Sequence, residues 1–433
     1  MQTPILSMLE NYAKQNNLRF HMPGHKGNVN ANNLFDEIFP FDITELDFSD
    51  NLLQPTGVIK QAQDLFASAV GAQNCFFVTN GSTCGILSLV SSSRGKLLVE
   101  RASHASVFNA LQLFGKDALV LNNKMSDGKF LPATFEQIEQ CVLQNNDIKT
   151  ILLTSPNYYG ECSDLQKIYE FCQSKNILLF VDGAHGAHFG FGNLTPDSIA
   201  KVCDACVVST HKTLPAMTQT ACVFAKDFVA QQIKQKLNVF NSSSPNYVLL
   251  ASIDFARAFM QKQVELGADK KTFELVEQIK KQTGHNFLQN DDFSRLVLVD
   301  TDGAKAREWL KQKGVYVEFC DASRVVLIIS LAENEQNLLK LKNILSDMPS
   351  FEKPLFNDVQ PDEVCSQLNH IDGQTVLVDI CDADGYICAN QCGGYPPCIP
   401  LFLHGEKITN ANRLLGFADT FGLFDNKIKV FKK

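Results

Sequence analysis

STHKTLP, at residues 209–215, follows the apolar run ACVV at 205–208, which is typical of a buried strand. A second apolar run, ILLFV at 177–181, ends at Asp182 and opens into GAHGAH. One strand end therefore carries a carboxylate, and another carries Lys212 about thirty residues later. In a parallel sheet both residues would reach the same edge, where α/β proteins bind their ligands.

A lysine and an aspartate at neighbouring strand ends are what a pyridoxal phosphate enzyme needs. The lysine forms the Schiff base with the cofactor, and the aspartate keeps the pyridine nitrogen protonated so that the ring accepts electrons. No other charge occurs between Lys212 and Gln219, and a desolvated lysine is a competent nucleophile. Taken alone, Asp182 could be a strand-end cap and Lys212 a surface lysine. The two segments together favour the cofactor.

The phosphate is expected at FFVTNGST, residues 76–83, where a strand enters a glycine turn and then a helix. The free amides at Gly81 and the start of the helix suit a phosphate, and Ser82 and Thr83 add hydroxyl donors. An ordinary serine helix cap has the same pattern. Beside the aspartate and lysine, phosphate binding becomes the better interpretation.

Four further residues are candidates for the same pocket. His104 begins a helix after the strand 97–100, where its ring can lie against the cofactor; a core or capping histidine is the alternative. His185 follows Asp182 by three residues and is expected to point to the same pocket, whereas His188 is expected to be a packing residue. Ser209 and His211 are placed to contact the phosphate and the reacting end of a substrate.

The rest of the chain predicts the frame around this pocket. Strands and helices alternate from residue 75 to 182, which indicates a mainly parallel sheet covered on both faces. Helices then lead to an α+β unit with strands near 296–299, 315–319 and 325–329, and prolines mark a linker over 349–361. The predicted units are an N-terminal helix and interface segment (1–50), a cofactor-binding large domain (51–285), a small α+β domain (286–350) and a C-terminal domain (360–433).

Composition limits the class of protein. A chain of 433 residues exceeds the roughly 250–300 that one core supports, so several domains are expected. A net charge of -8 argues against a nucleic-acid binder, which is usually basic. With no membrane-length apolar run and no signal-peptide pattern, a cytoplasmic protein is expected. The 14 cysteines fit reduced thiols, and neither the C-x-x-C at 203–206 nor the group at 381–398 predicts a metal site.

Several blocks resemble one known family. They are RFHMPGHKG (19–27), DNLLQPTGVIKQAQ (50–63), SPNYYGECSDL (155–165) and GYPPCIPLFLHGEKIT (394–409), together with FFVTNGST, DGAHGAH and STHKTLPAMTQ. With them the chain resembles the pyridoxal-phosphate decarboxylases of ornithine, lysine and arginine, which have the aspartate-aminotransferase (type I) fold. The resemblance implies a mainly parallel seven-stranded sheet, a small domain and a C-terminal appendage. The chain looks like the short form, similar to arginine decarboxylase.

By that resemblance Lys212 would be the Schiff-base lysine, Asp182 the pyridinium partner and His104 the stacking residue. Gly81, Ser82, Thr83 and Ser209 would lie at the phosphate, and His185 and His211 would line the pocket, with His211 or Lys212 returning a proton. The resemblance also implies a homodimer or higher homo-oligomer with a shared active site.

The chain departs from the family pattern at four positions. Gly183 stands where the family usually has Glu, Ala105 where it has Lys, and Cys398 where it has Gly. A carboxylate common before the Pro-Pro motif is replaced around Asn390. These departures bear on substrate choice and on activity.

The expected reaction is decarboxylation of a basic L-amino acid, preferably arginine, otherwise lysine or ornithine, to an amine of the polyamine pathway. Candidate carboxylates for its distal cation are Glu45, Asp47, Asp50, Asp384 and Glu406, although for each one alone a solvated surface acid is the favoured interpretation. A type I aminotransferase or lyase is one alternative. A catalytically impaired, cofactor-binding regulatory protein is the other.

Overall fold

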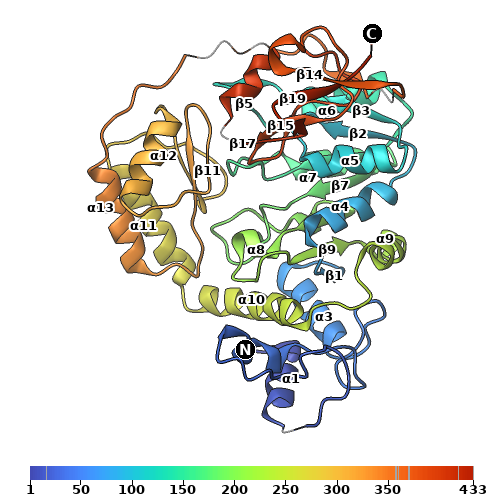
Figure 1. The fold of residues 1–433 in the computed structure, drawn as a ribbon, viewed down its shortest axis with the longest axis vertical. Coiled ribbons are helices and arrows are strands. Elements are labelled where there is room, and N and C mark those ends of the chain that lie inside the picture. Colours follow the sequence, from blue (N-terminus) through green and yellow to red (C-terminus); the bar gives the residue numbers. More distant parts are fainter. Residues whose placement is uncertain (16, 356–357, 359, 369–370, 418, 433) are drawn as a thin grey trace.

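The computed structural model describes residues 1–433 except 16, 356–357, 359, 369–370, 418 and 433. Its elements form a large α/β body, a smaller lobe at one side and a mostly β unit at one end (Figure 1). The linker predicted over 349–361 lies partly outside the described residues. Among the described residues, no helix is both long and apolar enough to cross a membrane.

A large sheet runs through the body in the strand order β1-β9-β8-β7-β6-β2-β3-β13. The strands β3, β2, β6, β7 and β8 run parallel, and β9 is antiparallel to both of its neighbours. The mainly parallel α/β prediction is therefore confirmed, and β13 adds an eighth strand by pairing with β3. The bounds are β1 Asn74–Val78, β2 Lys96–Glu100, β3 Ala118–Leu121, β6 Ile148–Thr154, β7 Leu178–Asp182, β8 Ala205–Val208, β9 Ala221–Ala225 and β13 Cys365–Gln367.

Both faces of this sheet are buried. Ile151 and Val181 face one core, while their neighbours Leu152 and Phe180 face the other. Because side chains alternate along a strand, an unbroken apolar run requires cover on both sides. The first core is covered by α1 (Pro4–Lys14), α3 (Val58–Val70), α6 (Phe135–Gln144), α7 (Leu165–Ser174) and α10 (Tyr247–Glu265), and the second by α4 (Gly81–Ser91), α5 (Ala105–Leu113) and α9 (Asp227–Phe240).

The small lobe has its own core. Three antiparallel strands in the order β10-β12-β11 pack against helices around Leu296 and Leu310. The strand expected over 315–319 forms only at its last residue, since the amide of Val315 instead donates to Leu310 O at 2.9 Å and closes a helix end. The elements are α11 (Ala268–Gln282), β10 (Arg295–Leu298), α12 (Gly303–Gln312), β11 (Phe319–Cys320), β12 (Val325–Ile328) and α13 (Glu335–Ser346).

One arginine makes several of the contacts that dock the C-terminal unit on the large sheet. Arg101, which follows β2, donates to Pro400 O at 2.7 Å and to Leu401 O at 2.6 Å. The amide of Ala105 donates to Cys398 O at 2.9 Å. The unit lies beside β2 and β3 (Figure 1) and consists of β14 (Thr375–Asp379), β19 (Lys427–Phe431) and β18 (Leu423–Phe424) in one sheet, and β16 (Pro400–Phe402), β15 (Cys392–Tyr395) and β17 (Asp419–Phe421) in another.

Arg101→Met should weaken this docking. The change leaves two partly buried carbonyls without their charged donor, so we expect the free energy of unfolding to fall by about 2–4 kcal/mol. Urea denaturation measures the loss, and limited proteolysis should cut the C-terminal unit first. Arg94→Met, which removes an exposed arginine, is the control. Equal stability of the two variants would contradict this account of the docking.

Candidate active site

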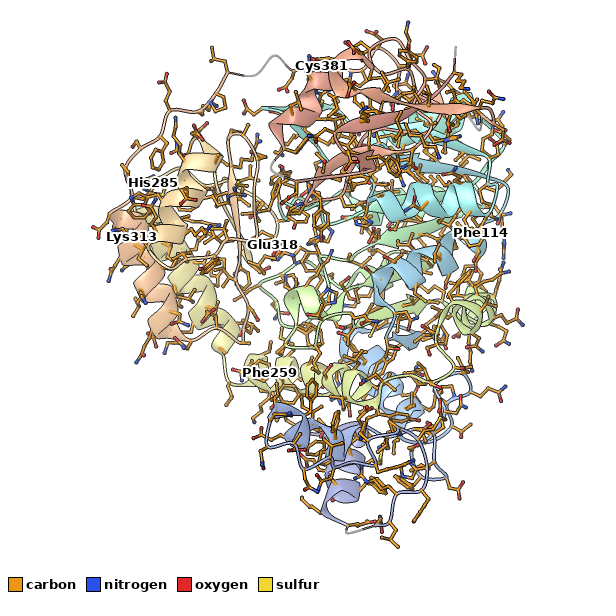
Figure 2. The ribbon with its side chains drawn as sticks, in the orientation of Figure 1. Phe114, Phe259, His285, Lys313, Glu318 and Cys381 are labelled. Atoms are coloured by element: carbon orange, nitrogen blue, oxygen red, sulfur yellow. The ribbon has the colours of Figure 1, made fainter. Side chains whose placement is uncertain are left out.

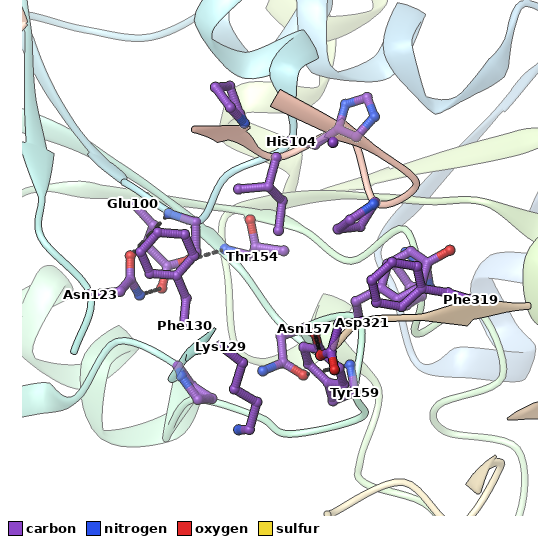
Figure 3. A pocket seen from close by; sticks show the side chains of 18 of the residues that line it. Glu100, His104, Asn123, Lys129, Phe130, Thr154, Asn157, Tyr159, Phe319 and Asp321 are labelled. Atoms are coloured by element: carbon purple, nitrogen blue, oxygen red, sulfur yellow. Dashed lines mark hydrogen bonds between the residues drawn. The ribbon is translucent and has the colours of Figure 1, made fainter. Parts of the chain in front are cut away.

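A cavity of about 180 Å³ lies at the sheet edge where the parallel strands end. All three units contribute to its wall. The large body supplies strand ends and the hairpin of β4 (Met125–Ser126) and β5 (Lys129–Phe130), the small lobe supplies Phe319 and Asp321, and the C-terminal unit supplies Pro397. Figure 3 shows labelled side chains of the large body, the hairpin and the small lobe arranged around a common space.

Lys212 and Asp182 line this cavity from neighbouring strands. Asp182 is the last residue of β7 and only 4% exposed, and Lys212 lies in the short helix α8 (Thr210–Thr213) just after β8. Burial lowers the pKa of Lys212, although the Asp182 carboxylate opposes this shift. Burial raises the pKa of Asp182, opposed by Lys212 and by the Ala184 amide, which donates to Oδ1 at 3.2 Å. The site therefore holds a lysine that loses its proton more readily than usual.

His185 joins the lysine to the small lobe. Its Nε2 lies 3.2 Å from Lys212 Nζ, and its Nδ1 lies 3.1 Å from Nη2 of Arg295 at the start of β10. The ring of Tyr158 meets the imidazole edge-on, with the centroids 4.7 Å apart. Burial, reinforced by Lys212 and Arg295, lowers the pKa of His185 well below its ordinary value. The imidazole is thus neutral at neutral pH.

His104 caps α5 with its own side chain. Nδ1 accepts from the amide of Ser106 at 3.1 Å, so the neutral ring carries its proton on Nε2. Burial, with a smaller effect of Lys212, lowers the pKa of His104 to about 4. The capping alternative is confirmed, and the same ring also lines the cavity.

Only some of the residues expected to bind the phosphate line the cavity. Ser82 lines the cavity, whereas Thr83 is exposed. Gly81 has the positive φ of 76° that glycine adopts readily, and its amide donates to Gln219 O at 2.8 Å. The Ser209 hydroxyl is buried without a hydrogen-bond partner.

His211 is also outside the cavity wall. Its Nδ1 is 2.9 Å from Thr220 O. The structure therefore brings Lys212, Asp182, His185, His104 and Ser82 together, and leaves Gly81, Thr83, Ser209 and His211 just outside the lining.

None of the four departures from the family pattern lies in the cavity wall. At Gly183 an added Cβ would come 2.5 Å from Ile199 Cδ1, so Ile199 occupies the space that a larger side chain would need. Ala105 and Cys398 meet through their backbones, and Asn390 accepts from the thiol of Cys388 through its carbonyl.

The carboxylates proposed for a distal cation lie elsewhere. Asp50 accepts from amides at the start of α3, Glu406 pairs with Arg101, Asp384 accepts from Ala411, Glu45 accepts from Thr44 and Asp47 is exposed. The acids that line the cavity besides Asp182 are Glu100 and Asp321. Glu100 is occupied by the amides of Thr154 and Ala133 and by Asn123 Nδ2 (Figure 3).

Sequence reasoning missed Tyr158, Glu318 and Arg295. The Tyr158 hydroxyl donates to Glu318 Oε1 at 2.5 Å, which places this acid beside the cavity. Glu318 stands on the side of the small lobe that faces the sheet (Figure 2). A signal existed for Arg295, because a charge opening the apolar run LVLV is unusual for a buried strand.

Comparison with known proteins agrees with this geometry. The family model described as Orn/Lys/Arg decarboxylase, major domain, matches residues 3–302, and the chain belongs to this family. It is 31% identical to the protein YaaO of Bacillus subtilis, over 94% of this chain and 92% of that protein. It is 27% identical to an arginine decarboxylase of Bacillus anthracis, over 95% of this chain and 92% of the relative.

Solved structures share the fold. The lysine decarboxylase LdcF of Francisella novicida superposes with a TM-score of 0.81 at 17% identity, covering 99% of this chain and 81% of that one. A serine palmitoyltransferase of Sphingomonas wittichii superposes with a TM-score of 0.55 at 13% identity, covering 69% and 79%. The chain therefore has the fold of type I pyridoxal-phosphate enzymes.

His104→Asn should make the protein less sensitive to acid. A histidine with a pKa of about 4 in the folded state and an ordinary 6.5 when unfolded binds a proton only after unfolding, so stability falls as the pH drops from about 6.5 to 4. Asparagine still caps α5 but does not titrate. Between pH 7 and 5 the variant should lose about 2 kcal/mol less unfolding free energy than the parent, measured by urea denaturation. Parallel losses in both proteins would contradict the lowered pKa.

Proposed function

We propose that the protein is a pyridoxal-phosphate-dependent decarboxylase of a basic L-amino acid, with arginine the preferred substrate. The observation that carries the proposal is the pair Lys212 and Asp182, which lie at neighbouring strand ends and face one cavity, with Asp182 buried and Lys212 partly buried. Membership of a decarboxylase family supports the reaction class. Relatives named arginine decarboxylase match over 92% of their length, whereas one named lysine decarboxylase LdcA matches over 41%, which supports arginine.

The residues present fit the cofactor. Lys212 would hold the aldehyde covalently, Asp182 would pair with the pyridine nitrogen and His104 would lie against the ring. The free hydroxyl of Ser209, with Ser82, Thr83 and the amide turn at Gly81, would take the phosphate. When bound, pyridoxal phosphate supplies the electron sink that lets a bond at the substrate's α-carbon break.

The protein's own groups set the conditions for that chemistry. Burial of the cavity strengthens the pairing of the Asp182 anion with a cation. Lys212 would be the proton donor to the substrate's α-carbon, and His211 would be the alternative donor. The neutral rings of His104 and His185 add no positive charge to compete for Asp182.

The far end of a basic substrate needs an acid, and Glu318 with Asp321 are the best candidates. Asp321 lines the cavity and already accepts from Tyr159 and Arg324. Glu318 accepts only from Tyr158 in the hydrogen bonds of the described residues, so it has free lone pairs for a guanidinium.

We further propose a cytoplasmic homodimer with a shared active site. The N-terminal segment exposes Leu18 by 87%, Phe20 by 90% and Met22 by 63%, an apolar surface that a second copy would cover. Cross-linking and sedimentation of the purified protein test the dimer.

Two other functions make different predictions. An aminotransferase or lyase would yield a keto acid or another product in place of CO2. A regulatory protein would bind the cofactor and show no turnover with arginine, lysine or ornithine. Assaying CO2 and keto acid with all three substrates separates these cases, and CO2 from none of them would contradict the proposal.

Lys212→Ala should abolish CO2 release, by at least about a thousandfold, because the covalent anchor and the proton donor are lost together. Borohydride reduction of the parent should label Lys212 with the cofactor, as shown by peptide mass spectrometry. Lys201→Ala, at an exposed lysine, is the matched control and should keep full activity. A label on any other lysine would contradict the assignment.

Glu318→Gln should raise KM for the basic substrate about tenfold to a hundredfold and leave kcat within a few-fold. The amide still accepts from Tyr158 but no longer carries the charge that pairs with the substrate cation. Glu308→Gln, at an exposed acid of α12, is the control. A fall in kcat at unchanged KM would instead indicate a role for Glu318 in the chemistry.

A further inference from the structure

Arg295 is a buried cation without an ion pair. It is 1% exposed, and among the described residues no carboxylate lies within salt-bridge distance of its guanidinium. Nη1 donates to Ser294 Oγ at 3.2 Å, and Nε has no partner. Burying an arginine this way costs stability, since its charge is taken from water and only partly compensated. Its remaining donor, Nη2, points at His185 alone.

The contact with His185 fixes the position of a proton. Nη2 of Arg295 lies 3.1 Å from Nδ1 and 3.3 Å from the carbonyl oxygen of His185. A guanidinium only donates, so Nδ1 must accept and can carry no hydrogen. The neutral imidazole therefore has its hydrogen on Nε2, the atom 3.2 Å from Lys212 Nζ. The Nε2–H of His185 can donate a hydrogen bond only to a nitrogen that has a lone pair. Nζ of Lys212 has one when the side chain is the uncharged amine, and has none when it is the ammonium.

We propose that Arg295 is a positioning residue that acts through His185 to hold Lys212 as the uncharged amine. We call the chain of contacts from Arg295 through His185 to Lys212 the relay. The free amine is the form that attacks an aldehyde, so the relay prepares the protein to take up its cofactor. This inference rests on the proposed function for the identity of the aldehyde. Arg295 does not line the cavity, because His185 stands between it and the lysine.

The backbone holds the relay rigidly. Arg295 begins β10, its amide donates to Asp292 O at 3.0 Å and its carbonyl accepts from Asn290 Nδ2 at 2.8 Å. Gly160 allows this approach, since a Cβ there would lie 2.8 Å from Arg295 Cβ. The second histidine of the motif is held from the same segment, with His188 Nε2 2.9 Å from Asp292 Oδ1.

Other charges also act on the lysine. Arg295 itself and His104 repel its proton, while Asp182, Glu318 and Cys398 favour it, and His185 is the one titratable group in hydrogen-bond contact with it among the described residues. The test must therefore separate the relay through His185 from the plain charge of Arg295.

The first measurement is the tautomer of His185 in the cofactor-free protein. With ¹⁵N-labelled histidine, NMR distinguishes a protonated ring nitrogen from a bare one, and the His185→Phe spectrum identifies the signal. We expect Nε2 protonated and Nδ1 bare. A proton on Nδ1 would overturn the proposal, and this measurement needs no arginine variant to fold.

The second measurement is the apparent pKa of Lys212, again without cofactor, from the pH dependence of its acetylation followed by mass spectrometry. Arg295→Met should raise this pKa by about one unit, a roughly tenfold loss of reactivity at a fixed lower pH. Arg324→Met is the matched control, because Arg324 is also buried in the small lobe and bonds to Asp321 and the hairpin, but not to His185. It should leave the pKa of Lys212 unchanged.

The double variant His185→Phe, Arg295→Met shows whether Arg295 acts on Lys212 through His185 or directly by its charge. If Arg295 acts through His185, the further change at Arg295 moves the Lys212 pKa by little in the His185→Phe background. A full shift there, or an equal shift in Arg324→Met, would overturn the proposal. If thermal denaturation shows that Arg295→Met is unfolded, Arg295→Lys replaces it. Lysine keeps the positive charge but lacks the two-pronged donor of the guanidinium. Decarboxylase assays are run separately, so absence of CO2 would count against the proposed function and not against the relay.

Discussion

Withdrawal of Lys212 and Asp182 from water is the constraint on which the rest of the structure depends. In water the two groups would be a fully charged lysine and a fully charged aspartate with little influence on each other. At the ends of β7 and β8 they lie beneath the hairpin, the small lobe and the C-terminal unit, and burial shifts both pKa values toward the neutral forms. Each unit therefore helps to exclude water from Lys212 and Asp182, even where it supplies no group that touches them.

The parallel sheet brings these residues together. Its strands end at one edge, so residues distant in sequence reach one space without long loops. The two apolar cores keep that edge in place, since both faces of β6 and β7 are packed. The small lobe then adds Phe319 to the cavity wall and Arg295 behind His185, and Arg101 holds the C-terminal unit at Pro400 and Leu401.

Local patterns sufficed to predict much of this protein. The apolar runs ending at Asp182 and Val208 predicted strands β7 and β8. Asp182 at the end of β7 and Lys212 just beyond β8 line one cavity. What the sequence did not reveal depends on distant pairing. Cys365–Gln367 is too short and polar to read as a strand, and it forms one only by pairing with β3. Arg295 meets His185 across 110 positions, and the acids near the cavity could not be told from surface acids without the lobe's placement.

The position of β13 has a consequence for how the chain is made. Gln367 contacts Ala118 across 249 positions, so the edge of the sheet at β3 stays open until residues 365–367 have left the ribosome. During that interval the nascent chain presents an unpaired strand of four buried apolar residues, a template for joining other chains. A product cut short before residue 365 would keep Lys212 and Asp182 and yet be prone to aggregate.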